Sequence, residues 1–173
     1  DRGYESYNNM AHIQEKGWYF LIRIKDGKTG IKEGLTLPNN DEFDVKISLK
    51  ITRRQTKETK ELFMDKNHYR FLPSNVTFDY LPLKSKKHDP IQFYTLNFRI
   101  VRFKVTDDLY ETVLTNLDAD SYSSGKLKEL YASRWGIETS FRDLKYTIGM
   151  LDFHSKKVMC IHQEIYSRLI MYN

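Results

Sequence analysis

Cysteine is almost absent from this sequence, since Cys160 is its single instance among 173 residues. One cysteine excludes an internal disulfide and any cysteine-rich zinc site. A chain without disulfides suits a reducing compartment, so we expect a cytoplasmic protein. No apolar run reaches the roughly 18 to 20 residues that a transmembrane helix needs, and no signal peptide opens the chain. We therefore expect no membrane partner.

Other residue types are scarce or restricted in position. The five histidines show no paired spacing that suits a metal ion. The four prolines all fall between residues 38 and 90, where turns between strands are expected. Hydrophobic residues make up 40% of the chain and charged residues 29%, which is typical of a soluble globular protein. The net charge of +5 suits a polyanionic partner, although many proteins without one share it.

The first part of the chain predicts a helix followed by a strand. Residues 5–16 carry apolar side chains at helical spacing, and Gly17 is a stop signal. Residues 18–25 then form an apolar strand closed by Asp26-Gly27. Because the run from Trp18 to Ile22 is almost continuously apolar, it predicts a central strand buried on both faces.

The middle of the chain predicts several antiparallel strands. The segment "DVKISLKIT" alternates apolar and polar residues from Val45 to Ile51, as a half-buried strand does. "FYTLNFRIVRFKV", Phe93 to Val105, repeats the pattern, and "YETVLTNL" is a shorter version. Two basic clusters, "ITRRQTK" and "LKSKKH", lie on or near these strands. They suit either contacts with DNA phosphates or a solvated edge that discourages aggregation.

The last part returns to helical spacing. Ser123 or Ser124 is expected to cap a helix whose apolar face contains Leu127, Leu130, Ile137, Phe141 and Leu144. A second helix is expected over residues 158–172, with the break between the two at Gly149. The fold class is therefore α+β, with a helix and a strand at residues 1–27, two helices at residues 118–173 and a β-rich insertion at residues 28–117.

One stripe of polar residues stands out on the first of these two helices. Tyr131, Arg134, Glu138 and Lys145 fall within an arc of about 60° if the helix advances by roughly 100° per residue. Such a stripe could hold a divalent metal through the carboxylate and phosphates through the cations. Spacing alone favours a simpler explanation, an Arg134–Glu138 ion pair one turn apart with Tyr131 at the edge of the core.

The identities in the stripe decide between these interpretations. The pattern Y-x2-R-x3-E-x6-K, within "LKELYASRWGIETSFRDLK", resembles the signature of bacterial DDE transposases of the insertion-sequence-four family. The opening "DRGYESYNNMAHIQEKGWYFLIRIK" resembles the segment in which these enzymes carry their second catalytic acid, here Asp1. These transposases also place a β-rich insertion between the second acid and the third.

The resemblance implies a fold, an activity and a set of site residues. It implies a partial RNase H-like core, a strand flanked by helices, interrupted by a large antiparallel β insertion. Asp1 and Glu138 would be catalytic acids and metal ligands, and two Mg²⁺ or Mn²⁺ ions would assist DNA cleavage and strand transfer. Tyr131, Arg134 and Lys145 would bind DNA.

The resemblance also sets limits and partners. The family's first acid precedes the second, and no residue precedes Asp1, so we expect a fragment of a longer transposase that is inactive alone. DNA is the expected partner, as transposon ends and target, with a homodimer in the synaptic complex of the intact enzyme. The expected location is the bacterial cytoplasm, in association with the nucleoid. The alternative is a DNA-binding or interaction module without catalysis, from a decayed mobile element.

Overall fold

The computed structural model describes every residue except 1, 26, 28–29, 85, 87 and 173. The chain divides into two compact units, Asp1–Lys126 and Leu127–Asn173. No helix in the described part of the chain is both long and apolar enough to cross a bilayer.

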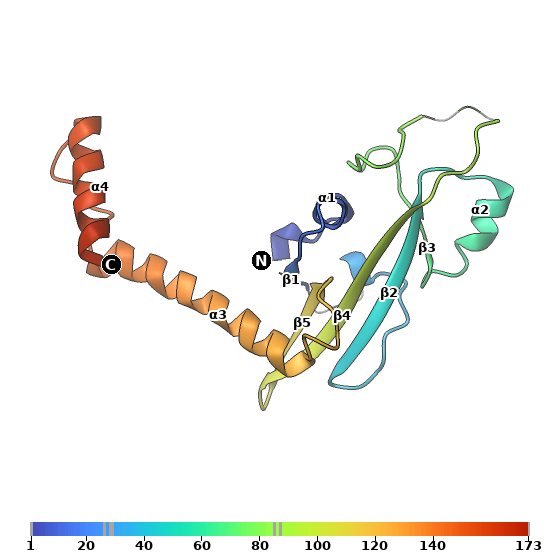
Figure 1. Ribbon diagram of the computed structural model, residues 1–173, viewed down its shortest axis with the longest axis horizontal. Helices are drawn as coiled ribbons and strands as arrows, with labels where there is room; N and C mark the ends of the chain where they lie inside the picture. Colours follow the sequence, from blue (N-terminus) through green and yellow to red (C-terminus); the bar gives the residue numbers. More distant parts are fainter. Residues whose placement is uncertain (1, 26, 28–29, 85, 87, 173) are drawn as a thin grey trace. The chain divides into compact units, whose positions relative to one another are not determined.

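The first unit is built on a five-stranded sheet (Figure 1). The spatial order is β1-β5-β4-β2-β3. The strands are β1 (Leu21–Arg23), β2 (Phe43–Thr52), β3 (Tyr69–Phe71), β4 (Tyr94–Thr106) and β5 (Leu109–Thr115). Neighbouring strands are antiparallel, except that β2 and β3 are parallel. The three strands predicted in the middle of the chain are β2, β4 and β5, within one or two residues of the expected bounds.

Alternating apolar residues of the strands form the core of this unit. Leu49 and Ile51 of β2 and Leu96, Phe98 and Ile100 of β4 are all buried. Period-two alternation places such residues on one face of each strand. The centre of β4 departs from the expected half-buried pattern, because Arg99 and Val101 on its other face are buried as well.

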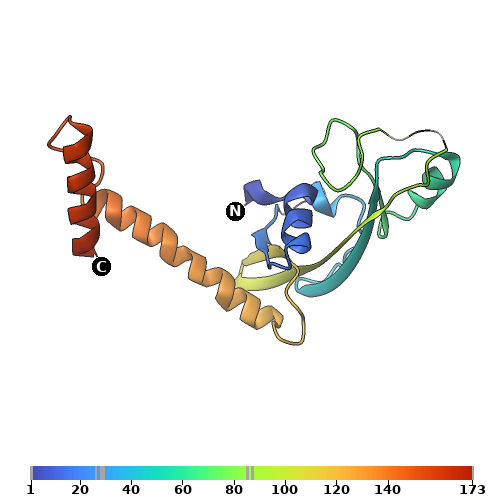
Figure 2. The same cartoon turned by 45° about the horizontal axis from the view of Figure 1, so that its top comes forward.

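Helix α1 (Tyr7–Glu15) lies beside β4 and closes one side of this core (Figure 2). Met10 and Ala11 on the helix are fully buried. The side-chain amide of Gln14 donates to Thr95 O over 2.9 Å and accepts from Asn97 N over 2.9 Å. One side chain thus forms hydrogen bonds with a backbone carbonyl and a backbone N–H of β4, as a neighbouring strand would.

The expectation that residues 18–25 form a central strand, buried on both faces, is wrong. In the described chain β1 pairs with β5 alone and lies at the end of the sheet order. Trp18 is 61% exposed and Tyr19 73% exposed, whereas Phe20, Ile22 and Ile24 are buried. From Tyr19 to Ile24 every second side chain is buried, a pattern that the continuous apolar sequence conceals.

A short helix that the sequence did not suggest follows β2. Helix α2 (Lys57–Leu62) begins at Thr56, whose hydroxyl accepts from Thr59 N over 3.2 Å. The Thr59 hydroxyl accepts in turn from Thr56 N over 2.7 Å. This reciprocal arrangement is a capping box in which threonine replaces the usual glutamate or glutamine. Thr56 belongs to the cluster "ITRRQTK", residues 51–57, so this cluster begins at the end of β2 and continues into α2.

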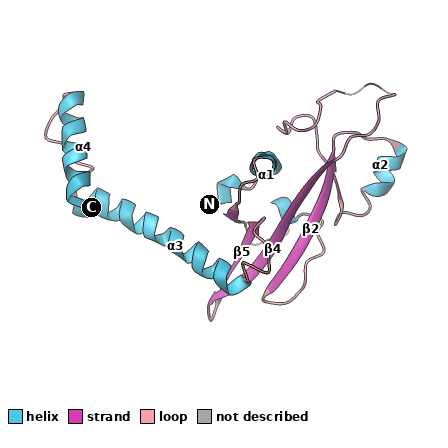
Figure 3. Ribbon diagram, in the orientation of Figure 1, coloured by secondary structure: helices cyan, strands magenta, loops and turns pink. Residues whose placement is uncertain are grey.

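The second unit contains most of helix α3 (Ser124–Arg142) and all of α4 (Val158–Tyr172) (Figure 3). Both helices match the predicted positions. A π-helical segment, η3 (Asp143–Thr147), follows α3 directly. The predicted apolar face of α3 is only partly buried: Leu127 is buried, but Leu130, Ile137 and Phe141 are exposed. Helical spacing indicates an apolar face but not what covers it.

The described chain is therefore an α+β structure, as predicted. The predicted divisions after residues 27 and 117 stay predictions, and β1 shares its sheet with the strands of the predicted insertion.

Candidate active-site helix

Helix α3 carries three of the four residues in the polar stripe. Its start agrees with the predicted serine cap, because Lys126 N donates to Ser123 Oγ over 3.4 Å. Tyr131, Arg134 and Glu138 then follow at intervals of three and four residues within the α-helix. These intervals place them on one face of the helix.

Arg134 connects the other two residues on this face. Its Nη1 lies 2.6 Å from Glu138 Oε1, and its guanidinium carbon lies 5.3 Å from the centre of the Tyr131 ring. The ion pair anticipated from the sequence is therefore present. Burial alone would lower the pKa of Arg134, but the hydrogen bond that it donates to Glu138 and the neighbouring Tyr131 phenol raise that pKa above its ordinary value. The guanidinium is thus held in its charged form.

The three side chains differ in their access to solvent. Tyr131 is only 5% exposed, so its ring is a fixed support for the guanidinium. The side chain of Arg134 is 31% exposed and that of Glu138 is 46% exposed. The carboxylate can therefore be reached by a metal ion or a ligand, and the cation beside it can be reached by a phosphate.

Lys145 lies beyond the end of the α-helix. It belongs to the π-helical segment, in which Ile148 N donates to Asp143 O over 2.9 Å. Bonds of this i to i+5 type place more residues in each turn, so the chain advances by less than 100° per residue. The predicted arc of about 60° holds for Tyr131, Arg134 and Glu138 but not for Lys145. Lys145 is exposed.

Candidate metal ligands are few in the described part of the chain. There, no three side chains of histidine, cysteine, aspartate or glutamate form a group that could hold a metal ion. Asp1, predicted as a catalytic acid and metal ligand, lies outside the described residues. Glu138 offers carboxylate oxygens of the kind that Mg²⁺ and Mn²⁺ prefer, and it is accessible. A metal site using Glu138 would therefore need further acids.

The segment after the π-helix is held by side chains of α4 that the sequence analysis did not single out. The Glu164 carboxylate accepts from His154 N and Ser155 N, each over 3.2 Å. These bonds, that from His154 N foremost, lower the pKa of Glu164 below its ordinary value. Arg168 donates to Gly149 O and lies 3.3 Å from Glu164. These bonds fix the link between the two helices to α4. Of its features, only the break at Gly149, where φ is positive, was indicated by the sequence.

Comparison with known proteins supplies the context for this geometry. Residues 1–173 match the model of a family described as Transposase DDE domain. Over 64 residues the chain is 36% identical to "Transposase InsG for insertion sequence element IS4" from Escherichia coli (strain K12). That match covers 35% of this chain and 14% of the InsG protein. No solved structure matches the chain.

Proposed function

Because this chain belongs to the transposase DDE domain family, we propose that it forms part of the catalytic domain of an insertion-sequence transposase. The whole enzyme would cleave and join DNA with divalent metal ions. The observation that carries the proposal is the arrangement on α3, where a buried tyrosine, a fixed arginine and an accessible glutamate share one face.

The fold proposed for the catalytic part is an RNase H-like core. Helix α1, strand β1 and helix α3 would belong to it, and β2 to β5 would form the insertion. The order of elements along the chain supports this assignment, because a helix and strand follow the Asp1 segment and a long helix follows the β-rich region.

We assign the acid chemistry to Asp1 and Glu138. Two bound Mg²⁺ or Mn²⁺ ions would supply the charge that activates the attacking oxygen and stabilises the leaving oxygen of a phosphodiester. Glu138 would be one of the ligands, Asp1 a second, and an acid on a strand before Asp1 the third. The accessible carboxylate of Glu138 supports its part in this set.

Tyr131, Arg134 and Lys145 would hold the DNA. The planar guanidinium of Arg134 can bind two phosphate oxygens at once, and the Tyr131 ring keeps it in place. Lys145 would act as an exposed point charge about two turns beyond Glu138. Transposon ends and target DNA are the proposed partners, with a homodimer as the proposed assembly on paired ends.

The test is cleavage of element-end DNA in Mg²⁺ by a transposase that contains this chain and the residues before Asp1. Glu138→Gln should abolish cleavage, because the amide cannot replace a carboxylate ligand. Glu129→Gln is the matched control, since Glu129 is an exposed acid on the same helix. Undiminished cleavage in Glu138→Gln would contradict the assignment. DNA binding without any metal effect, with the upstream residues present, would indicate the non-catalytic alternative.

A further inference from the structure

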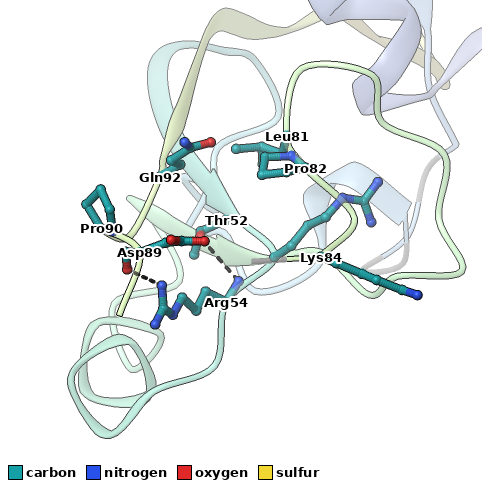
Figure 4. Close-up of a pocket in the computed structure, with 9 residues that line it drawn as sticks. Thr52, Arg54, Leu81, Pro82, Lys84, Asp89, Pro90 and Gln92 are labelled. Atoms are coloured by element: carbon teal, nitrogen blue, oxygen red, sulfur yellow. Dashed lines mark hydrogen bonds between the residues drawn. The ribbon is translucent and has the colours of Figure 1, made fainter. Parts of the chain in front are cut away.

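A cavity of about 320 Å³ opens in the first unit where β2 ends (Figure 4). It lies between residues 52–54 and the segment of residues 81–92 that leads into β4. Three cations, Arg53, Arg54 and Lys84, line it against one carboxylate, Asp89. Its walls bring Lys84 of the cluster "LKSKKH" together with Arg53 and Arg54 of the cluster "ITRRQTK".

The two arginines that line this cavity donate hydrogen bonds to different segments of the chain. Arg53 donates to the carbonyl oxygens of Pro73, Val76 and Phe78, at 2.7, 2.8 and 3.2 Å. Its guanidinium therefore holds the loop after β3 and is largely committed to the protein. Arg54 reaches toward the 81–92 segment instead, where its Nη1 donates to Asp89 O (Figure 4).

The other charged side chains that line this cavity and the adjoining one are lysines and carboxylates. Figure 4 shows the Lys84 side chain extending away from Asp89. The Asp89 carboxylate accepts from Lys86 N over 2.6 Å. A second cavity shares Arg54 and Asp89 with the first and adds Lys57, with Glu58 as its other acid. Across both cavities, four cations face two carboxylates.

We propose that Arg54, Lys57 and Lys84, which we call the basic band, bind the phosphate backbone of double-stranded DNA. Cations that follow one another along adjoining cavities suit successive phosphates of a polymer better than one free phosphate ion. The band contacts no base edge and adds affinity without sequence preference. The inference rests on the proposed function for the identity of the polyanion, and it gives the β-rich region its own contact with DNA.

The experiment measures binding of the 173-residue chain to a duplex of unrelated sequence, without divalent metal, between about 50 and 200 mM salt. The test variant is Lys57→Gln/Lys84→Gln, and the control is Lys16→Gln/Lys104→Gln. Each pair lowers the net charge equally. The control lysines lie outside the band, Lys16 beside the Trp18 ring and Lys104 beside Asp107. Thermal unfolding of both variants shows whether they fold like the unchanged chain.

The slope of log K against log salt is negative, and each lost phosphate contact reduces its magnitude by about 0.9. In the test variant the magnitude of this slope should therefore fall by about 2, and binding at about 0.1 M salt should weaken about 60-fold. The control variant should bind almost as the unchanged chain does. Equal losses in both variants, no loss in the test variant, or no binding by the unchanged chain would overturn the proposal. Displacement of the duplex by inorganic phosphate at constant ionic strength would also overturn it, in favour of a small-anion site. Because the assay requires no cleavage, its outcome is independent of the role of Glu138.

Discussion

Replacing Arg99 by methionine removes a buried cation that connects three parts of the first unit. The Arg99 side chain is 4% exposed. Its Nε donates to Asp44 Oδ1 over 3.0 Å, and its Nη2 donates to Asp44 Oδ2. Its Nη1 donates to the carbonyls of Leu117 and Tyr122, at 2.8 and 3.1 Å. The guanidinium thus joins β4 to β2 and to the segment before α3.

The expected loss of stability follows from what the substitution leaves behind. Removing one partner of a buried ion pair costs about 3 to 5 kcal/mol, because the other charge stays buried without compensation. The Asp44 side chain is 32% exposed, so water restores part of its solvation and the cost falls near the lower end. Two carbonyls also lose their donor. We expect Arg99→Met to lower the free energy of unfolding by about 3 kcal/mol.

Urea denaturation followed by circular dichroism measures this loss, with the slope against urea showing whether the unfolding transition has changed in kind. The control is Arg99→Met/Asp44→Leu, which removes both charges. It should lose less than the single variant, because no uncompensated carboxylate remains. A loss below about 1 kcal/mol in Arg99→Met, or a double variant less stable than the single one, would refute the reasoning.

Further predictions concern the α2 cap and the link between α3 and α4. Thr56→Ala should lower the free energy of unfolding by about 1 kcal/mol through loss of the capping box, and an unchanged urea midpoint would contradict this. Glu164 has a lowered pKa in the folded chain, so its contribution is present above the ordinary value of 4.5 and is lost as the pH falls through the folded pKa. Its carboxyl resonance in an NMR titration should therefore have its midpoint below 4.5, and a midpoint at or above that value would be inconsistent with the bonds to residues 154 and 155. Gly149→Ala should cost about 1 kcal/mol because φ is +70° there, and equal stability in thermal unfolding would count against that strain.

Much of the secondary structure could be predicted because local patterns determine it. Strand β2 follows from the alternation over residues 45–51, and helices α3 and α4 follow from apolar residues at helical spacing. The prediction that β1 is a central strand is wrong, because an apolar run does not show which side chains face solvent. Trp18 and Tyr19 belong to the same aromatic run as the buried Phe20, yet both are exposed, and the sequence pattern does not distinguish the three.

Long-range contacts account for the features that the sequence did not predict. Arg99 occupies a polar position in an alternating strand, yet it is buried because Asp44 and two carbonyls surround it. Gln14 pairs with a strand about eighty residues away in the chain. No periodicity in the sequence reports such contacts, since each depends on how distant segments meet.

The candidate site was predicted from residue identity more than from spacing. Spacing placed Tyr131, Arg134 and Glu138 on one helical face, and the Arg134–Glu138 pair is present as anticipated. Spacing did not predict the position of Lys145, because the change from α-helix to π-helix after Arg142 has no clear signal in the sequence. The roles proposed for these residues depend on membership of the transposase family.

The most direct test of the central proposal, that Glu138 is a metal ligand in DNA cleavage, is a change of metal preference. Glu138→Cys replaces a hard carboxylate by a softer thiolate, which Mn²⁺ accepts more readily than Mg²⁺ does. In a transposase that contains this chain and the residues before Asp1, we predict no cleavage of element-end DNA by this variant in Mg²⁺ and partial recovery in Mn²⁺. Equal cleavage by the variant and the unchanged enzyme in Mg²⁺ would contradict the account.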